Sequence, residues 1–333
     1  MSPILSYSKL HLLKSCTWKF WCRYALKLPD TSNDGALRGN ICHDIFELLL
    51  LDKHRKLYLE LLNYPDDLEN HPLLSKLVNQ KMLNYGIGEF DNKGHDNRGM
   101  IFDMLFVGIQ TDFLCEGHTL AAPEKEIDYK NEKMGYHIRG FIDKLSYCND
   151  KAYIWDYKTS ARKFEGEDAS NNLQSLMYAL YIKRVEKLDS IVRFMFLRFE
   201  DDPIMEYQPS EEDLAGFEYY LSWVTKKLKH FDHDMALSGL ASDEGFPPKD
   251  SGFWGKLMCG KAHYPGHKKA NGELYFHCPY KFPFYYWAKV DKSGKTLKTA
   301  HDIMDIGELK EGQDIVRKHY SGCPAFKKYN KQI

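Results

Sequence analysis

The sequence predicts an α/β fold in which a mixed central sheet is flanked by helices and preceded by a helical region. Three observations predict it. Apolar residues recur at helical spacing in the first third of the chain, three short segments between residues 118 and 157 alternate like strands, and helix-like and strand-like segments then follow in turn. Elements in this order pack as helical layers on a sheet.

The helical segments come first. Ser6 is a candidate N-cap, and Leu10, Leu13 and Cys16 follow at helical spacing. Residues 54–118 are also expected to be mostly helical, with a break near 86–99 that contains Gly and Asn. Other helices are expected over about residues 38–53, 100–115, 169–186 and 209–235.

The strand-like segments span residues 118–129, 135–147 and 151–157, with turns at 130–133 and 148–150. This pattern predicts an antiparallel meander of three strands. A further apolar strand is expected at 191–199, and the region after residue 240 has a mixed pattern rich in Gly, Lys and aromatic residues.

The composition bounds the class of protein. The chain has 333 residues, 43% of them hydrophobic and 14% aromatic, which is enough for a sizeable core. Its formal net charge is −1, but residues 250–333 hold fifteen Lys and Arg against eight Asp and Glu. That stretch is a candidate phosphate-binding face, with an ordinary solvated basic surface as the alternative. No signal peptide or membrane-length apolar run is recognisable, so we expect a soluble, cytoplasmic or otherwise intracellular protein.

The strongest chemical pattern lies on two adjacent predicted strands. Gly140-Phe141-Ile142-Asp143 ends one, and Ile154-Trp155-Asp156-Tyr157-Lys158-Thr159 forms the next. Asp156 and Lys158 share one face because strand side chains alternate. A hairpin brings Asp143 beside them. Carboxylates bind hard divalent cations, and a nearby ammonium stabilises charge on a scissile phosphate, so this set suits phosphodiester hydrolysis. The alternative is a surface ion pair.

Two weaker patterns lie on predicted helices. His43 and Glu47 are four residues apart, share a helix face, and offer an imidazole and a carboxylate to Mn²⁺ or Mg²⁺. Gln174 and Tyr178 share a face in the same way and are polar enough to reach a phosphate or a base. Each pattern alone also fits an ordinary helix surface.

Together these elements resemble the RecB-type branch of the PD-(D/E)XK nuclease superfamily, which includes AddB-type and CRISPR-adaptation nucleases. The segment Leu5–Leu10 and the element Ser15–Phe20 resemble the family's first helix and its Cys-Pro-x-x-Tyr/Phe element, with Thr17 where Pro is usual. The matching motifs then follow in the family's order: Gly39-x-x-x-His43, Gly140-x-x-Asp143, Asp156-Tyr157-Lys158-Thr159 and Gln174-x-x-x-Tyr178.

The resemblance implies a restriction-endonuclease-like core and a Mg²⁺- or Mn²⁺-dependent deoxyribonuclease. It implies a nuclease domain over residues 1–240 with a helical insertion at about 54–117, and an extension over 241–333 that packs on it. The implied metal ligands are His43, Asp143, Asp156 and the Tyr157 carbonyl. Lys158 is the implied catalytic lysine, and the implied supporting residues are Glu126, Gln174 and Tyr178, to which helix spacing adds Glu47.

The resemblance also implies the pathway and the partners. An exonuclease of DNA recombination, repair or phage DNA processing is expected, acting on DNA with single-stranded ends. No helicase motif is present, so a helicase or recombinase partner would supply any unwinding. The alternatives are a structure-selective or nicking endonuclease and an inactive DNA-binding scaffold.

The cysteines leave three alternatives. Many RecB-type nucleases hold an iron–sulfur cluster, and Cys16 fits its first cysteine, but Cys259, Cys278 and Cys323 are too widely spaced for the family's C-terminal group. A zinc site that includes nearby histidines is the second alternative. Free buried thiols are the interpretation we favour from spacing. The aromatic segment 275–287 similarly fits either a base-stacking surface or, as we favour, a core segment.

Overall fold

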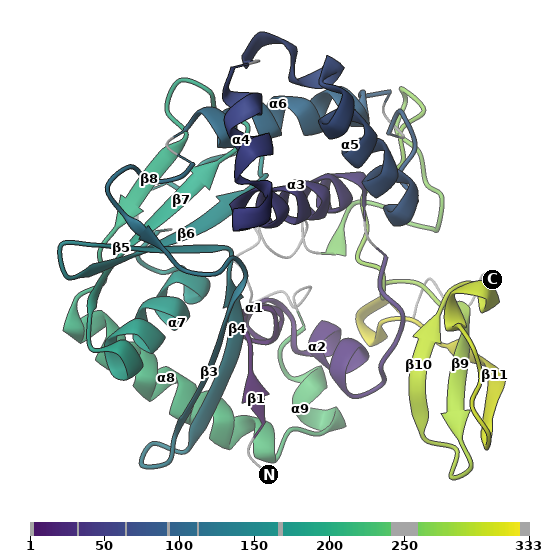
Figure 1. The fold of residues 1–333 in the computed structure, drawn as a ribbon. Helices are drawn as coiled ribbons and strands as arrows, with labels where there is room; N and C mark the ends of the chain where they lie inside the picture. The colour runs from purple at the N-terminus through teal and green to yellow at the C-terminus, as the bar shows by residue number, and fades with distance from the viewer. Residues whose placement is uncertain are drawn as a thin grey trace. The chain divides into compact units, whose positions relative to one another are not determined.

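The computed structural model describes residues 3–31, 33–63, 65–91, 94–111, 113–165, 169–240 and 259–326. The chain divides into two compact units (Figure 1). The first unit comprises Met1–Tyr7 and Ser32–Lys229, and the second comprises Ser8–Thr31 and His230–Ile333. The N-terminal residues 8–31 thus belong to the same unit as the expected extension over 241–333.

The helices of the described residues are α1 (Tyr7–Ser15), α2 (Thr17–Tyr24), α3 (Asp34–Leu50), α4 (Arg55–Leu62), α5 (Pro72–Tyr85), α6 (Asn97–Gln110), α7 (Leu173–Tyr181), α8 (Glu211–Lys229) and α9 (His233–Leu237). The strands are β1 (Ile4–Leu5), β2 (Thr119–Leu120), β3 (Lys125–Asn131), β4 (Tyr136–Ile142), β5 (Lys144–Cys148), β6 (Lys151–Lys158), β7 (Asp189–Phe196), β8 (Ile204–Tyr207), β9 (Phe284–Asp291), β10 (Thr296–Ala300) and β11 (Gln313–Tyr320).

The first unit confirms the mixed α/β fold. Its five-stranded sheet has the order β2-β5-β6-β7-β8, in which β6 and β7 are parallel and the other pairs antiparallel. A three-stranded sheet, β1-β4-β3, adds a parallel β1–β4 pair. Figure 1 shows α3–α6 on one side of the five-stranded sheet and α7 and α8 on the other.

The predicted three-strand meander is wrong. The segment expected as one strand over 135–147 divides at Asp143 into β4, which pairs with β3, and β5, which pairs with β6 in the other sheet. The side chain of Asp143 accepts a hydrogen bond from the backbone N–H of Tyr157 at 2.9 Å. The polar residue at the junction is thus held against β6, where the chain passes from one sheet to the other.

Several helix boundaries also differ from the prediction, because polar caps interrupt the apolar pattern. The first helix breaks at Cys16, whose sulfur caps α2 by accepting the N–H of Lys19. The helix expected over 209–235 ends at Lys229, and Asp232 caps the separate α9. The helix expected from residue 169 begins after its N-cap, Asn172.

The helical region that follows α3 is confirmed by α4, α5 and α6. These helices bury a large apolar cluster against α3 and β6. The ring of Phe46 on α3 lies 4.6 Å from that of Tyr157 on β6, and a Cβ atom at Gly108 on α6 would lie 2.2 Å from Phe46. This close packing fixes α3 over the end of β6.

The second unit is built on an antiparallel sheet of order β10-β9-β11. Its core joins α2 and α9 to one face of this sheet through Trp18, Cys22, Tyr286 and Ala288. The indole of Trp18 donates a hydrogen bond to the hydroxyl of Tyr320 at 2.9 Å. These contacts explain why residues 8–31 belong with the C-terminal region.

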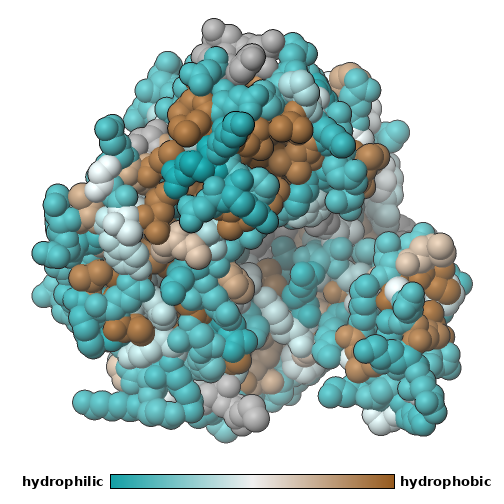
Figure 2. All heavy atoms as spheres, viewed as in Figure 1, coloured by the Kyte–Doolittle hydropathy of each residue, from teal (hydrophilic) through white to brown (hydrophobic). Residues whose placement is uncertain are grey.

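The polarity of the surface and the lengths of the helices describe the exterior of the protein. Figure 2 shows a largely hydrophilic face on which hydrophobic residues form separate patches. Among the described residues, no helix combines the length and the apolar character needed to span a membrane.

Candidate active site

A glycine brings the histidine helix to the edge of the sheet. Gly39 lies on α3 one turn before His43, and a Cβ atom at this position would lie 2.9 Å from Oγ1 of Thr159, which follows β6. Real Cβ contacts of this kind are avoided, so a larger residue would push the helix away. Gly39 therefore lets α3 approach closely enough for His43 to reach the strand ends.

The two strands place their carboxylates side by side, as the hairpin prediction required. In the β5–β6 register Lys144 lies opposite Trp155, so the preceding Asp143 comes level with Asp156. Asp143 accepts the N–H of Tyr157, and its Oδ1 atom lies 3.5 Å from Nδ1 of His43. Both carboxylates are buried, with 9% of Asp143 and 2% of Asp156 exposed.

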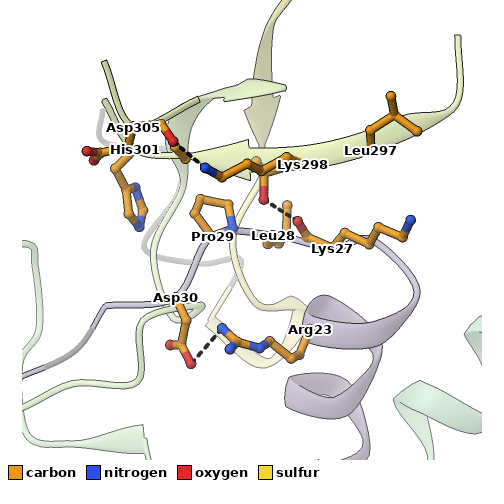
Figure 3. Close-up of a pocket in the computed structure, with 11 residues that line it drawn as sticks. Arg23, Lys27, Leu28, Pro29, Asp30, Leu297, Lys298, His301 and Asp305 are labelled. Carbon is orange, nitrogen blue, oxygen red and sulfur yellow. Dashed lines mark hydrogen bonds and ion pairs between the residues drawn. The ribbon is translucent and has the colours of Figure 1, made fainter. Parts of the chain in front are cut away.

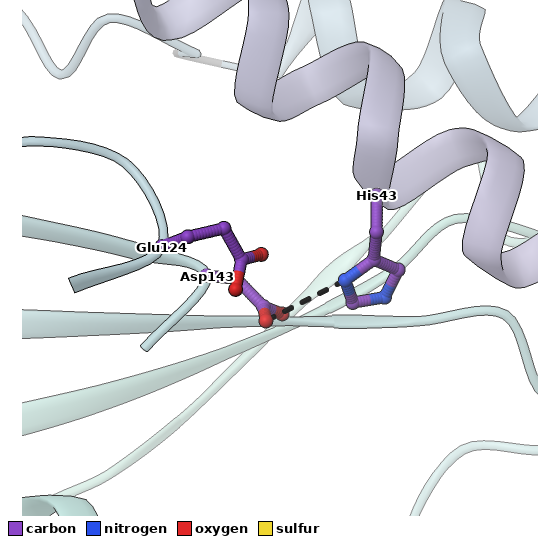
Figure 4. Close-up of side chains that lie close together, drawn as sticks. All are labelled: His43, Glu124 and Asp143. Carbon is purple, nitrogen blue, oxygen red and sulfur yellow. Dashed lines mark ion pairs between the residues drawn. The ribbon is translucent and has the colours of Figure 1, made fainter. Parts of the chain in front are cut away.

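His43, Glu124 and Asp143 form a candidate metal centre (Figure 4). One ligand atom from each lies within 4.8 Å of the others. Glu124 also donates its backbone N–H to the Asp143 carbonyl at 3.3 Å. Two carboxylates and an imidazole suit Mg²⁺ and, more readily, Mn²⁺. This donor set fits the expected divalent cation.

The glutamate expected to support the centre was misplaced by two residues. Glu126 lies on the exposed side of β3, with 57% of its side chain exposed and its carboxylate 3.8 Å from Arg139. Glu124 comes just before the strand with φ 49°, a left-handed conformation that takes it out of the strand alternation. The resemblance that implied Glu126 therefore did not point to Glu124, whose direction depends on this local conformation.

The charges at this centre favour an added cation. Burial and the carboxylate of Asp143 raise the pKa of Glu124 to about 7. Burial lowers the pKa of His43, but the neighbouring carboxylates, Asp143 first, raise it to about 9. At neutral pH the imidazolium thus supplies the positive charge that a metal ion would otherwise supply. Glu47, exposed on α3, adds a smaller negative field that also raises the pKa of Glu124.

Lys158 lies at the centre of a short polar chain. Its Nζ atom lies 2.5 Å from Oδ2 of Asp156 and donates to Oε1 of Gln174 at 3.0 Å. Gln174 in turn donates to the hydroxyl of Tyr178 at 3.1 Å. A Cβ atom at Gly140 would lie 3.2 Å from the Tyr178 ring, so this glycine leaves room for the chain. The structure thus brings all four predicted motifs together.

The Asp156–Lys158 pair is the most buried charged pair of the centre. Burial raises the pKa of the Asp156 carboxyl, and the ammonium of Lys158 opposes the shift. Burial lowers the pKa of Lys158, but Asp156 raises it above its ordinary value. The lysine is therefore positively charged at neutral pH, as stabilisation of a charged transition state requires.

Tyr7 is a site residue that sequence reasoning missed. It opens α1, and burial raises the pKa of its hydroxyl while the charges of Lys158 and Asp156 act on it. The only sequence signal was its place in the opening motif Leu5–Leu10, which we interpreted as a helix start.

Comparisons with known proteins identify the family. The sequence profile described as the PD-(D/E)XK nuclease superfamily matches residues 4–249. The chain belongs to the PD-(D/E)XK nuclease superfamily. The matched residues include every predicted motif from Gly39 to Tyr178. The family assigned by the match is therefore the one that the motifs indicated.

Other comparisons are more distant. No curated protein matches the chain. A crystal structure from Eubacterium rectale, described as that of a candidate exonuclease, is similar with 11% identity and a TM-score of 0.44. That similarity covers 68% of this chain and 81% of the other. The family assignment rests on the sequence match alone.

Four cysteines of the second unit gather around one small cavity. Cys16, Cys259, Cys278 and Cys323 line it, together with the buried Lys281. Lys281 is 4% exposed and donates to the carbonyls of Gly260 and Ala262 at 3.0 and 2.6 Å. None of the chain's eight cysteines, all of which lie in the described residues, forms a disulfide bond. Four cysteines that are far apart in the sequence thus line the same cavity in the folded chain.

The charges around this cavity fit a thiolate-bound group. Its described lining contains the cations Lys19 and Lys281 and no carboxylate, and burial lowers the pKa of Lys281. Thiolates are the only anions that this lining can supply, and metal binding generates them. The donor set therefore fits the cluster that the RecB-type resemblance implies.

A separate pocket of about 510 Å³ lies in the second unit, between the end of α2 and β10 (Figure 3). Its wall holds three cations, but each already has an oxygen partner. Arg23 pairs with Asp30 at 3.0 Å, and Lys27 and Lys298 donate to backbone carbonyls. The pocket is therefore a weaker candidate for phosphate than its cation content indicates.

Proposed function

We propose that this chain is a metal-dependent deoxyribonuclease that hydrolyses phosphodiester bonds. The observation that carries the proposal is the approach of His43, Glu124 and Asp143 within 4.8 Å of one another, beside the Asp156–Lys158 pair. Metal ligands next to a charged lysine are the groups that this reaction needs. The match to the PD-(D/E)XK superfamily supports the same reaction.

His43, Glu124 and Asp143 would hold the cation, and Asp156 and the Tyr157 carbonyl, which the family resemblance implies as ligands, would complete its coordination. A bound Mg²⁺ or Mn²⁺ stabilises charge on the phosphate and lowers the pKa of a coordinated water. Lys158, held by Asp156 and Gln174, directs its ammonium at the nucleophile or the developing charge. Tyr178 fixes Gln174 and so orients the lysine.

The finer assignment is an exonuclease of the RecB-type branch. The motif order from Leu5 to Tyr178 and the four gathered cysteines support that branch. Its substrate would be DNA with single-stranded ends. The enzyme would act in recombination, repair or phage DNA processing, together with a helicase or recombinase partner. The nuclease domain and its extension would act together inside the cell.

A cleavage assay on matched substrates tests the proposal. End-labelled linear DNA and circular single-stranded DNA are incubated with Mg²⁺, with Mn²⁺ and with EDTA. We expect degradation of the linear strand from its end in either metal and none in EDTA. Cleavage of the circle would replace the exonuclease with an endonuclease, and no cleavage in any arm would leave an inactive scaffold.

As a second function, we propose that Cys16, Cys259, Cys278 and Cys323 hold an iron–sulfur cluster. The observation that carries it is their gathering around one cavity beside a buried lysine. The cysteines would tie the N-terminal segment of the second unit to its C-terminal strands. The free thiols that the sequence spacing favoured are the alternative, and the iron and zinc content of the protein decides between the two.

A further inference from the structure

The strand β9 has two faces of different chemistry. Tyr286, Ala288 and Val290 are buried in the core of the second unit. Tyr285 and Trp287 alternate with them and therefore lie on the opposite, outer face of the sheet. Tyr285 exposes 60% of its surface. The part of the aromatic segment 275–287 that lies in β9 thus contributes both to the core, through Tyr286, and to the outer face, through Tyr285 and Trp287.

The neighbouring strand β11 completes this outer face with basic groups. The register places His319 opposite Tyr285 and Arg317 opposite Trp287, and directly opposed residues of an antiparallel pair share a face. The Arg317 guanidinium carbon lies 4.4 Å from the centre of the Tyr285 ring, and the His319 ring lies 4.8 Å from it. An exposed tyrosine is thereby held between two nitrogen-rich side chains.

The charge on this face is positive where the aromatic residues lie. Lys289 is the next outward residue of β9 after Trp287, and its Nζ atom donates to the backbone carbonyl of Glu308. Asp291 shares the face at its far end, but its carboxylate accepts the N–H groups of Ser293 and Lys295 in the β9–β10 turn. A polyanion would meet cations beside the rings.

We propose that the outer face of this sheet, centred on Tyr285, Trp287 and Arg317, binds single-stranded DNA. Unpaired bases offer free π-faces that stack on aromatic side chains, while arginine contacts the phosphates. Paired bases are already stacked on each other, so a duplex cannot use Tyr285 in this way. The inference rests on the proposed function for its choice of DNA and adds a binding surface outside the metal centre.

The test measures binding without cleavage. A fluorescently labelled single-stranded oligonucleotide is titrated with protein in EDTA, and anisotropy gives the dissociation constant. We expect Tyr285→Ala to weaken binding on the order of tenfold, and Tyr285→Phe to bind like wild type because it keeps the ring. Tyr219→Ala is the matched control, since Tyr219 is 72% exposed on α8 of the first unit.

An abasic strand of the same length separates bases from phosphates. Tyr285→Ala should bind it as wild type does, whereas Arg317→Ala should bind both strands more weakly. Equal weakening of Tyr285→Ala on both strands, or no weakening on either, would overturn the proposal, as would tighter binding of single-stranded RNA than of DNA. Because the assay contains no metal, failure of the cleavage assay would overturn the proposed function without changing this result.

Discussion

The Nδ1 atom of His43 lies 3.5 Å from Oδ1 of Asp143, while the other oxygen of that carboxylate accepts the N–H of Tyr157. Asp143 thus links helix α3 to strand β6 at the point where the chain passes between two sheets. The same carboxylate is held rigidly and has one oxygen directed at the candidate metal centre. Prearranged ligands of this kind reduce the reorganisation that metal binding requires.

Glu124 and Glu126 form a matched pair for testing the metal centre. Glu124→Gln removes a charged ligand, so we expect weaker Mn²⁺ binding in a calorimetric titration. Glu126→Gln changes a residue that is exposed beside Arg139 and should bind Mn²⁺ like wild type. Equal effects of the two substitutions would show that Glu124 has no special place in the centre.

Metal binding should strengthen as the pH rises. His43 must lose its proton to ligate a metal, and its pKa is raised to about 9, while that of Glu124 is raised to about 7. Below these values the proton competes with the metal, so affinity for Mn²⁺ should increase between about pH 6 and about pH 9. In His43→Ala only the step due to Glu124 should remain, and it should lie above pH 7, because the imidazolium that lowers the pKa of Glu124 is gone. Calorimetry at a series of pH values measures this, and a pH-independent affinity in wild type would contradict it.

Gly39 should be intolerant of even one methyl group. Its Cβ would lie 2.9 Å from Oγ1 of Thr159, so Gly39→Ala should destabilise the fold by about 1–3 kcal/mol despite its better helix propensity. Thr159→Ala removes the opposing atoms and should recover part of the loss. Urea denaturation of the single and double variants measures both effects, and a stabilised Gly39→Ala would refute the close approach.

The cysteine cavity should contain iron. Protein purified without oxygen should be brown, with iron and sulfide in stoichiometric amounts, and Cys278→Ser should lose both. Cys148→Ser is the control, because Cys148 lies in β5 of the first unit. Colourless protein with neither iron nor zinc would restore the interpretation of free thiols, and stoichiometric zinc would replace the cluster with a mononuclear site.

The sequence predicted the parts of the site that depend on local period. Asp156 and Lys158 share a strand face, and Gln174 and Tyr178 share a helix face, as their spacing required. Long-range relations were not predictable in this way. Cys16 and Cys259 line one cavity only because of the packing of the second unit, and no local sequence pattern indicates that arrangement.

The sequence-based prediction was wrong or incomplete at two other positions because of their local conformation. The resemblance implied Glu126, and no sequence pattern indicated that a left-handed backbone takes Glu124 out of the strand alternation. The predicted meander is wrong at Asp143, where a strand-like pattern continues across the passage between the two sheets. In both cases the exception lies at the candidate metal centre, where functional geometry overrides regular structure.

The most direct test of the account is a Mn²⁺ titration of the cleavage rate for wild type, Lys158→Ala and His43→Ala. Lys158 acts on the charged transition state, so Lys158→Ala should be slower by roughly a hundredfold or more, about 3 kcal/mol, at every metal concentration. His43 completes the metal coordination, so excess Mn²⁺ should at least partly restore His43→Ala. Full rescue of Lys158→Ala by metal, or a normal rate in that variant, would contradict the account and leave Asp156 and Lys158 as a structural ion pair.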